Sequence, residues 1–161
     1  MEKISSLLVA LKNSANDYPH LKRLTFVKGG TFGWNHTACA ITYAIDSAKS
    51  EPYLLHEFGH ALLNHSDYSD DISLLKMERA AWDEAVSIAQ RLAIELPADT
   101  VEDALDTYRD WLHSRSLCPH CGATGFQSSK RVYSCIACGA EWRVNEARAC
   151  ALRRSIIKKR P

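Results

Sequence analysis

The sequence contains no run of about 18 consecutive apolar residues, the length that a membrane-spanning helix requires. Its nearest approach to a targeting segment, Leu7 to Leu11, is too short for the core of a signal peptide and has no small-residue cleavage site behind it. A strong charge of one sign is also missing, because 20 Lys and Arg nearly balance 19 Asp and Glu. We therefore expect a cytoplasmic protein that does not enter a membrane.

The composition is that of an ordinary globular chain. Of the 161 residues, 46% are hydrophobic and 24% are charged, which is enough apolar material for a core and excludes a mainly disordered chain. The near-neutral total hides an asymmetry along the sequence. Residues 1–129 hold eleven basic and seventeen acidic residues, a formal charge of −6, whereas residues 130–161 hold nine basic and two acidic residues, a formal charge of +7.

The hydrophobic periodicity predicts an α+β fold. Apolar residues recur at helical spacing in the first dozen residues, from Glu51, over 72–96 and from Asp99. Two runs rich in β-branched and aromatic residues, Leu24 to Val27 and 37–45, predict strands of a small sheet. After Ser116 the composition changes to cysteine, glycine and short β-like pieces.

One of the helical segments carries an HExxH motif, His56-Glu57-Phe58-Gly59-His60. A spacing of four residues stacks the two imidazoles on one helix face, within reach of a single metal ion. Glu57 then lies beside that ion, where its carboxylate can take a proton from a zinc-bound water and pass it to a leaving amine. The motif predicts a catalytic zinc held by His56 and His60, with Glu57 as the general base.

A catalytic zinc needs a third protein ligand, and two glutamates of the next helix compete for this role. Glu78 falls in the middle of the apolar stripe of residues 72–96, where a carboxylate is normally paired or metal-bound. Glu84 points roughly 90° away from the centre of the stripe, toward the polar side. We therefore predict Glu78 as the ligand; the alternatives are an ion pair of Glu78 with Arg or Lys, and Glu84 as the ligand. His65, five residues after His60, is interpreted as a surface or helix-end histidine.

The segment from Glu51 to about Pro97 resembles the ImmA/IrrE type of zinc peptidase, a gluzincin-like group that pairs HExxH with a downstream Glu-x-x-Ala helix. The matching residues are His56-Glu57-Phe58-Gly59-His60-Ala61-Leu62-Leu63-Asn64-His65 and Glu78-Arg79-Ala80-Ala81-Trp82. The resemblance implies a zincin-like fold, with His56, His60 and Glu78 as zinc ligands and Glu57 as catalytic base. It also implies an endopeptidase acting on a regulatory, repressor-type protein, whose extended segment would pair with an edge strand in 37–45. Trp82 stands where the family often has Asn or Asp.

Four of the six cysteines form two Cys-x-x-Cys-Gly pairs. Each tight turn brings two thiolates to one side, and two such turns close a four-sulfur site that leaves no open position. Metal binding can supply the folding energy that so short a segment cannot gain from a core. The spacing therefore predicts a zinc ribbon with a structural zinc, held by Cys118, Cys121, Cys135 and Cys138.

The chain beyond the ribbon is basic, and we expect a helical tail there. The cations of ribbon and tail include Arg143, Arg148, Arg153, Arg154, Lys158, Lys159 and Arg160. With Trp142 and Tyr133 nearby, they could form a phosphate-binding surface for nucleic acid. The predicted organisation is a zincin-like domain over 1–115, a zinc ribbon over 116–143 and a basic tail over 144–161.

Two other functions stay open at this level. HExxH followed by a zinc ribbon and a basic tail also suggests a SprT/Spartan-like peptidase acting on DNA-bound proteins, a family that typically uses a third histidine, for which His113 and His120 are the candidates. The other is a non-catalytic zinc-ribbon module that binds nucleic acid or protein. The residue that would stabilise an oxyanion is not determined; the candidates are Tyr43, His65 and Tyr68.

Overall fold

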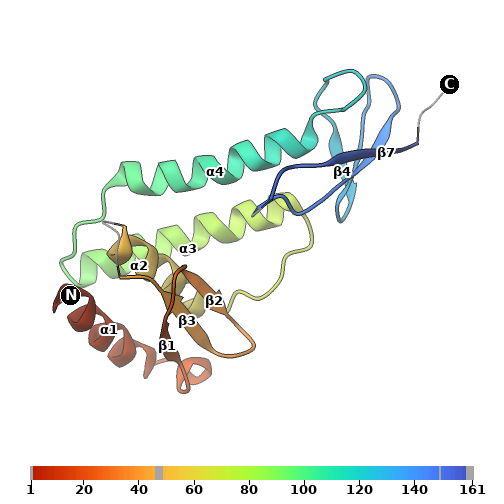
Figure 1. Ribbon diagram of the computed structural model, residues 1–161. Coiled ribbons are helices and arrows are strands. Elements are labelled where there is room, and N and C mark those ends of the chain that lie inside the picture. Colours follow the sequence, from red (N-terminus) through yellow and green to blue (C-terminus); the bar gives the residue numbers. More distant parts are fainter. Residues whose placement is uncertain (1, 46–48, 149, 159–161) are drawn as a thin grey trace. The chain divides into compact units, whose positions relative to one another are not determined.

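The computed structural model of the chain describes residues 2–45, 49–148 and 150–158. The described residues form an α+β structure with four α-helices and two small sheets, which confirms the predicted class (Figure 1). The chain divides into two compact units, and each is described by itself. Unit 1 comprises Met1–Asp67 and Met77–Val101, and unit 2 comprises Tyr68–Lys76 and Glu102–Pro161.

Unit 1 is built around a three-stranded sheet and the helices next to it in sequence. Its elements are α1 (Glu2–Ala15), a short 3-10 helix (Pro19–Leu21), β1 (Thr25–Lys28), β2 (Gly33–Asn35), β3 (Ala40–Tyr43) and α2 (Ser50–Leu62). The core consists of fully buried aliphatic and aromatic side chains, among them Leu11, Leu24, Ile41, Leu54, Leu55 and Phe58. Burial of this apolar surface is the main stabilising contribution to the unit.

The strand order is β1-β3-β2, with β1 parallel and β2 antiparallel to β3. The expectation of an edge strand in 37–45 is wrong, because β3 forms the centre of the sheet. Ile41 of β3 is fully buried and pairs with Phe26 on one side and Trp34 on the other. The edge strand that runs antiparallel to its neighbour is therefore β2.

Helix α3 (Asp71–Arg91) is shorter than the predicted helix over 72–96. Its end is set by Ala93, which has a positive φ of 53°. The backbone N–H of Ala93 bonds to the carbonyl of Gln90, and that of Ile94 bonds to the carbonyl of Ala89 at 2.9 Å. These two bonds form a Schellman turn, which satisfies the last carbonyls and ends the helix before Pro97.

Unit 2 contains most of α4 (Ala98–Ser116) and a second sheet. The strands are β4 (Phe126–Ser129), β5 (Val132–Ser134), β6 (Glu141–Val144) and β7 (Arg154–Lys158), in the antiparallel order β4-β5-β6-β7. The core of the sheet consists of Tyr133 stacked on Trp142, with ring centroids 5.7 Å apart, and Val144.

The prediction of a helical tail is wrong for Arg154–Lys158, which form β7. This strand pairs with β6, and the side chain of Asn145 braces the turn between them by accepting from the backbone N–H of Arg153 at 2.8 Å and donating to the carbonyl of Ala151. Two adjacent β-branched residues, Ile156 and Ile157, favour the extended conformation. The backbone of β6 thereby gains hydrogen bonds on its second side.

A buried ion pair connects α3, α4 and the sheet within unit 2. Asp71 and Arg115 are only 3% and 1% exposed, and Arg115 Nε donates to Asp71 Oδ2 at 2.6 Å. The hydroxyl of Tyr133 donates to the same carboxylate, and Trp142 Nε1 donates to the carbonyl of Arg115 at 3.0 Å. The ribbon sheet is therefore fixed to two helices by hydrogen bonds as well as by its own core.

None of the described helices combines the length and the hydrophobicity that crossing a membrane demands.

Candidate metal centre

The two histidines of the HExxH motif lie on α2 and are buried, with exposures of 4% for His56 and 8% for His60. Between them, Gly59 allows α3 to approach closely: a Cβ at this position would lie 2.4 Å from the carbonyl oxygen of Ala81. Any larger residue at position 59 would push the two helices apart. The glycine therefore lets α3 bring Glu78, which is 4% exposed, against both imidazoles.

Three potential ligand atoms converge at this point. His56 Nε2 lies 3.1 Å from Glu78 Oε2 and 3.1 Å from His60 Nε2, and His60 Nε2 lies 3.4 Å from Glu78 Oε2. In a tetrahedral zinc site, Zn–N and Zn–O bonds of about 2.0–2.1 Å place ligand atoms about 3.3 Å apart. The three distances fit a single zinc ion, and His56, His60 and Glu78 form a group that could hold one.

The partners of Glu78 also distinguish a ligand from an ordinary ion pair. Among the described residues, its ion pairs are with the two histidines rather than with Arg or Lys. Burial alone would raise the pKa of Glu78, but His56 and His60 outweigh burial and hold the pKa well below its usual range. Glu84 lies elsewhere on α3, where Arg91 Nη2 donates to Glu84 Oε1 at 3.3 Å. The structure thus brings Glu78, and not Glu84, to the histidines.

Glu57 is half-buried beside the ligand group. Burial raises the pKa of its carboxyl, and electrostatic interactions with His56 and His60 only partly oppose this effect. The carboxylate also accepts a hydrogen bond from the backbone N–H of Trp34 on β2. Glu57 is therefore held between the metal-ligand group and the edge strand, in an environment that favours binding a proton.

His65 contacts the ligand group, although its sequence position indicated a surface or helix-end histidine. Asn64 has a positive φ of 53°, and the backbone N–H of His65 bonds to the carbonyl of His60 at 3.0 Å. This Schellman turn ends α2 and folds His65 back over the last turn, so that its Nδ1 lies 2.9 Å from Nδ1 of His60. Trp34 Nε1 donates to the carbonyl of His65 at 2.8 Å. Asn at position 64, a common helix-ending residue, was the sequence signal for this fold-back.

The contact between His60 and His65 determines which nitrogen of His60 can bind a metal. If His60 Nδ1 donates its hydrogen to His65, then Nε2 carries the lone pair that faces His56 and Glu78. Such partners orient a ligating imidazole and typically change metal affinity by about 10- to 100-fold.

We expect His65→Ala to weaken zinc binding at the His56/His60/Glu78 group by about 10- to 100-fold, because His60 loses the acceptor that orients it. Competition with a chromophoric chelator measures this affinity. His113→Ala, at an exposed position in the last turn of α4, is the matched control and should leave zinc binding unchanged. Equal zinc affinities of the His65 variant and the wild type would contradict the orienting role.

His56 is held differently from His60. Its ring stacks on Trp82 of α3, with centroids 4.3 Å apart and planes inclined by 24°. Its Nδ1 is buried and has no hydrogen-bond partner among the described atoms. Packing against Trp82 therefore orients His56.

The four predicted cysteine ligands form a second group in unit 2. The sulfurs of Cys118 and Cys138 are 3.7 Å apart, and those of Cys121 and Cys135 are 3.6 Å apart. These separations are far longer than a disulfide bond of about 2.05 Å. They fit the edges of a tetrahedral four-sulfur zinc site, about 3.8 Å for Zn–S bonds of about 2.3 Å.

The two cysteine turns have the same backbone geometry. Gly122 and Gly139 have positive φ angles of 77° and 71°, and their N–H groups bond to the carbonyls of Cys118 and Cys135, each at 2.9 Å. Burial raises the pKa of Cys118, but hydrogen bonds from the backbone N–H groups of Cys121 and His120 outweigh it and lower the pKa to about 7. The first turn thus favours the thiolate form of Cys118, which is the form that binds a metal.

Other candidate residues lie outside both ligand groups. Within the part of the chain that the structure describes, neither His113 nor His120 joins a group of potential metal ligands. Tyr68 belongs to unit 2 and donates to Glu146 at 2.9 Å, and burial together with Glu146 raises its pKa to about 12. Tyr43 ends β3 and is half-buried.

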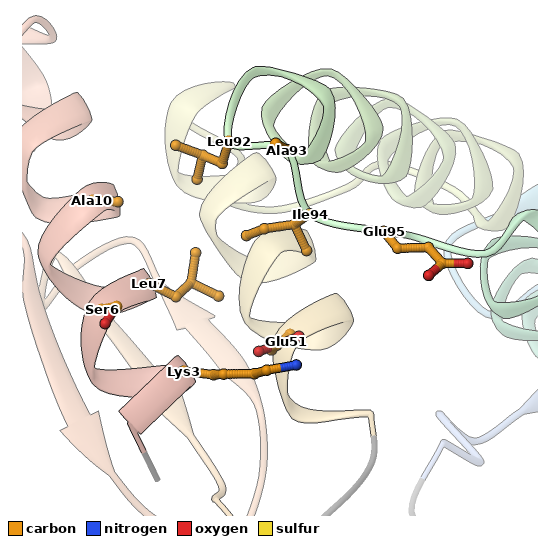
Figure 2. Close-up of a pocket in the computed structure, with 9 residues that line it drawn as sticks. All are labelled: Lys3, Ser6, Leu7, Ala10, Glu51, Leu92, Ala93, Ile94 and Glu95. Atoms are coloured by element: carbon orange, nitrogen blue, oxygen red, sulfur yellow. The ribbon is translucent and has the colours of Figure 1, made fainter.

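A pocket of about 730 Å³ lies elsewhere in unit 1 (Figure 2). Side chains from α1, the first turn of α2 and the segment after α3 line it, among them Leu7, Glu51 and Ile94. None of the potential metal ligands lines this pocket, so it is separate from the metal centre.

Comparison with known proteins adds no relative, since no protein-family model, no curated protein and no solved structure matches the chain.

Proposed function

We propose that the chain is a zinc-dependent endopeptidase that hydrolyses peptide bonds of a protein substrate. The observation that supports this proposal is the convergence of His56, His60 and Glu78, with ligand atoms 3.1–3.4 Å apart, beside the carboxylate of Glu57. Three protein ligands leave one position of a tetrahedral zinc open, as catalysis requires. The cysteine group has four ligands and therefore suits a structural zinc.

The chemistry divides between the metal and the chain. When bound, zinc supplies Lewis acidity, which polarises the peptide carbonyl and lowers the pKa of water in the open position to about 7. Glu57 takes the proton of the attacking water and delivers it to the leaving amine. Its raised pKa suits a group that must hold this proton between the two steps. Trp34 on the edge strand fixes the carboxylate through its backbone N–H.

The proposed substrate class is a regulatory, repressor-type protein. This part of the proposal rests on the resemblance of residues 51–97 to the ImmA/IrrE peptidases. An extended substrate segment can add to β2, because β2 is an edge strand of the sheet.

Two variants of α3 test the ligand set. Glu78→Ala should lose one of two zinc ions per chain and all hydrolytic activity, because Glu78 completes the three-ligand group. Glu84→Ala removes a carboxylate from the same helix that pairs with Arg91, and it should keep both zinc ions and full activity. Metal analysis of the purified chains and mass spectrometry of a random peptide library after digestion measure the two effects.

Three results would contradict the proposal. If only Glu84→Ala loses a zinc ion, the third ligand is Glu84 and not Glu78. One zinc per wild-type chain would favour a non-catalytic zinc-ribbon module. A wild-type chain that holds two zinc ions and cleaves no peptide of the library would remove the catalytic function.

A further inference from the structure

The four-stranded sheet of unit 2 has two faces of different character. Its inner face consists of the buried core residues Tyr133, Trp142 and Val144. Strand register places another set of side chains together on the opposite side, because Phe126 pairs with Ser134, and Arg143 pairs with both Val132 and Ser155. We call this set the outer face: Phe126, Val132, Ser134, Arg143 and Ser155.

The outer face is accessible and presents an aromatic ring beside a cation. Phe126 is 52% exposed, and Arg143 and Ser155 are also exposed. Arg153 directly precedes β7 and continues the register, since its carbonyl accepts from the backbone N–H of Asn145 at 3.3 Å. This position, two residues before Ser155, places Arg153 on the side of Arg143.

These two arginines differ from Arg109, Arg115 and Arg131 of the same unit, which pair with carboxylates. Arg115 is buried against Asp71, Arg109 pairs with Glu102 and Asp106, and Arg131 pairs with Glu146 at 2.6 Å. For Arg143 and Arg153, the described residues provide no carboxylate in ion-pair distance. No described carboxylate therefore pairs with either arginine, although Glu141 lies on the same side of β6.

We propose that the outer face binds single-stranded nucleic acid. Phosphates complement Arg143 and Arg153, and the formal charge of +7 over residues 130–161 attracts a polyanion. The exposed ring of Phe126 offers a surface on which an unpaired base can stack, while serine hydroxyls can bond to the backbone. An open sheet face with an aromatic ring and cations suits a flexible strand better than a rigid duplex.

The two aromatic residues that the sequence suggested for a phosphate-binding surface do not lie on the outer face. Tyr133 and Trp142 are 2% and 0% exposed and stack on each other in the core, so neither can stack on a base. Phe126 takes this role instead. Binding through phosphates and stacking is tolerant of sequence, and it strengthens at low salt.

Fluorescence anisotropy with a labelled 20-nucleotide oligo(dT) tests the proposal on the full zinc-loaded chain. We expect binding at 50 mM KCl that weakens at 200 mM, with a slope that decreases in the double variant Arg143→Ala/Arg153→Ala. Phe126→Ala should weaken binding by roughly 5- to 150-fold, the effect of losing one base–aromatic stack. Arg109→Ala, which removes a paired arginine from α4, is the control and should bind as the wild type does.

Several outcomes would overturn the proposal. These are absence of binding at 50 mM KCl, unchanged binding by both the double variant and Phe126→Ala, or an equal loss in Arg109→Ala. Tighter binding of a duplex of the same length would show that the partner is double-stranded DNA and not a single strand. Zinc content and circular dichroism of each variant show whether the sheet is intact. The outcome is independent of the proposed peptidase activity, because the outer face contains no residue of the His56/His60/Glu78 group.

Discussion

Glu57→Gln is expected to lower the rate of peptide hydrolysis by about 10²- to 10⁴-fold, the usual contribution of a general base, while two zinc ions stay bound per chain. Glutamine has the shape of glutamate and keeps an oxygen that can accept from the backbone N–H of Trp34. It cannot take a proton from water at neutral pH. The loss should therefore appear in kcat, with the metal centre and the fold intact.

The matched control for this experiment is Glu51→Gln, the same substitution on the same helix. Glu51 lies in the first turn of α2 and lines the separate pocket of Figure 2. We expect its activity to equal that of the wild type. Full hydrolytic activity of Glu57→Gln, measured with a cleaved peptide of the library, would refute the role of Glu57 even if the zinc ligands are correct.

Asp71→Ala is expected to lower the free energy of unfolding by about 3–5 kcal/mol, because it leaves the charge of Arg115 buried without its carboxylate. Both side chains are almost inaccessible, and the same carboxylate also accepts from Tyr133. Urea unfolding of the zinc-loaded chain, followed by circular dichroism, measures the change.

The neighbouring Asp70 provides the control for Asp71. Its Oδ1 accepts from the backbone N–H of Ser73 at 2.8 Å and caps α3, so Asp70→Ala should cost only about 1 kcal/mol. Adding Arg115→Met to Asp71→Ala should recover part of the loss, since no unpaired charge then stays buried. If Asp71→Ala lowers the free energy of unfolding no more than Asp70→Ala does, the Asp71–Arg115 pair contributes little to stability.

Local patterns were sufficient to select the residues of the candidate metal sites. The spacing of His56 and His60 follows from the pitch of a helix, and Glu78 stood out as a carboxylate on an apolar stripe. The two Cys-x-x-Cys-Gly pairs are local turns whose glycines adopt positive φ angles. In each case the ligands are either close in sequence or, like Glu78, polar at a position where the periodicity predicts an apolar side chain.

The residues that orient the ligands and Glu57 could not be predicted from such local patterns. His65 contacts His60 only because α2 ends at Asn64 in a left-handed turn, whereas a continued helix would carry it away. Trp34 binds Glu57 and His65 from a strand that is distant in sequence. The role of Trp82 as the surface on which His56 stacks likewise depends on how closely α3 packs at Gly59.

The sequence by itself determined the α+β class and singled out the two sets of potential metal ligands, because periodicity and ligand spacing are properties of short segments. The tertiary structure decided which strand forms the edge of the first sheet, that Arg154–Lys158 pair as β7, and that Tyr133 and Trp142 lie in a core rather than on a binding surface. These features depend on backbone hydrogen bonds and side-chain burial between segments far apart in the chain. Such contacts leave no periodic trace in either partner, so only the folded arrangement shows them.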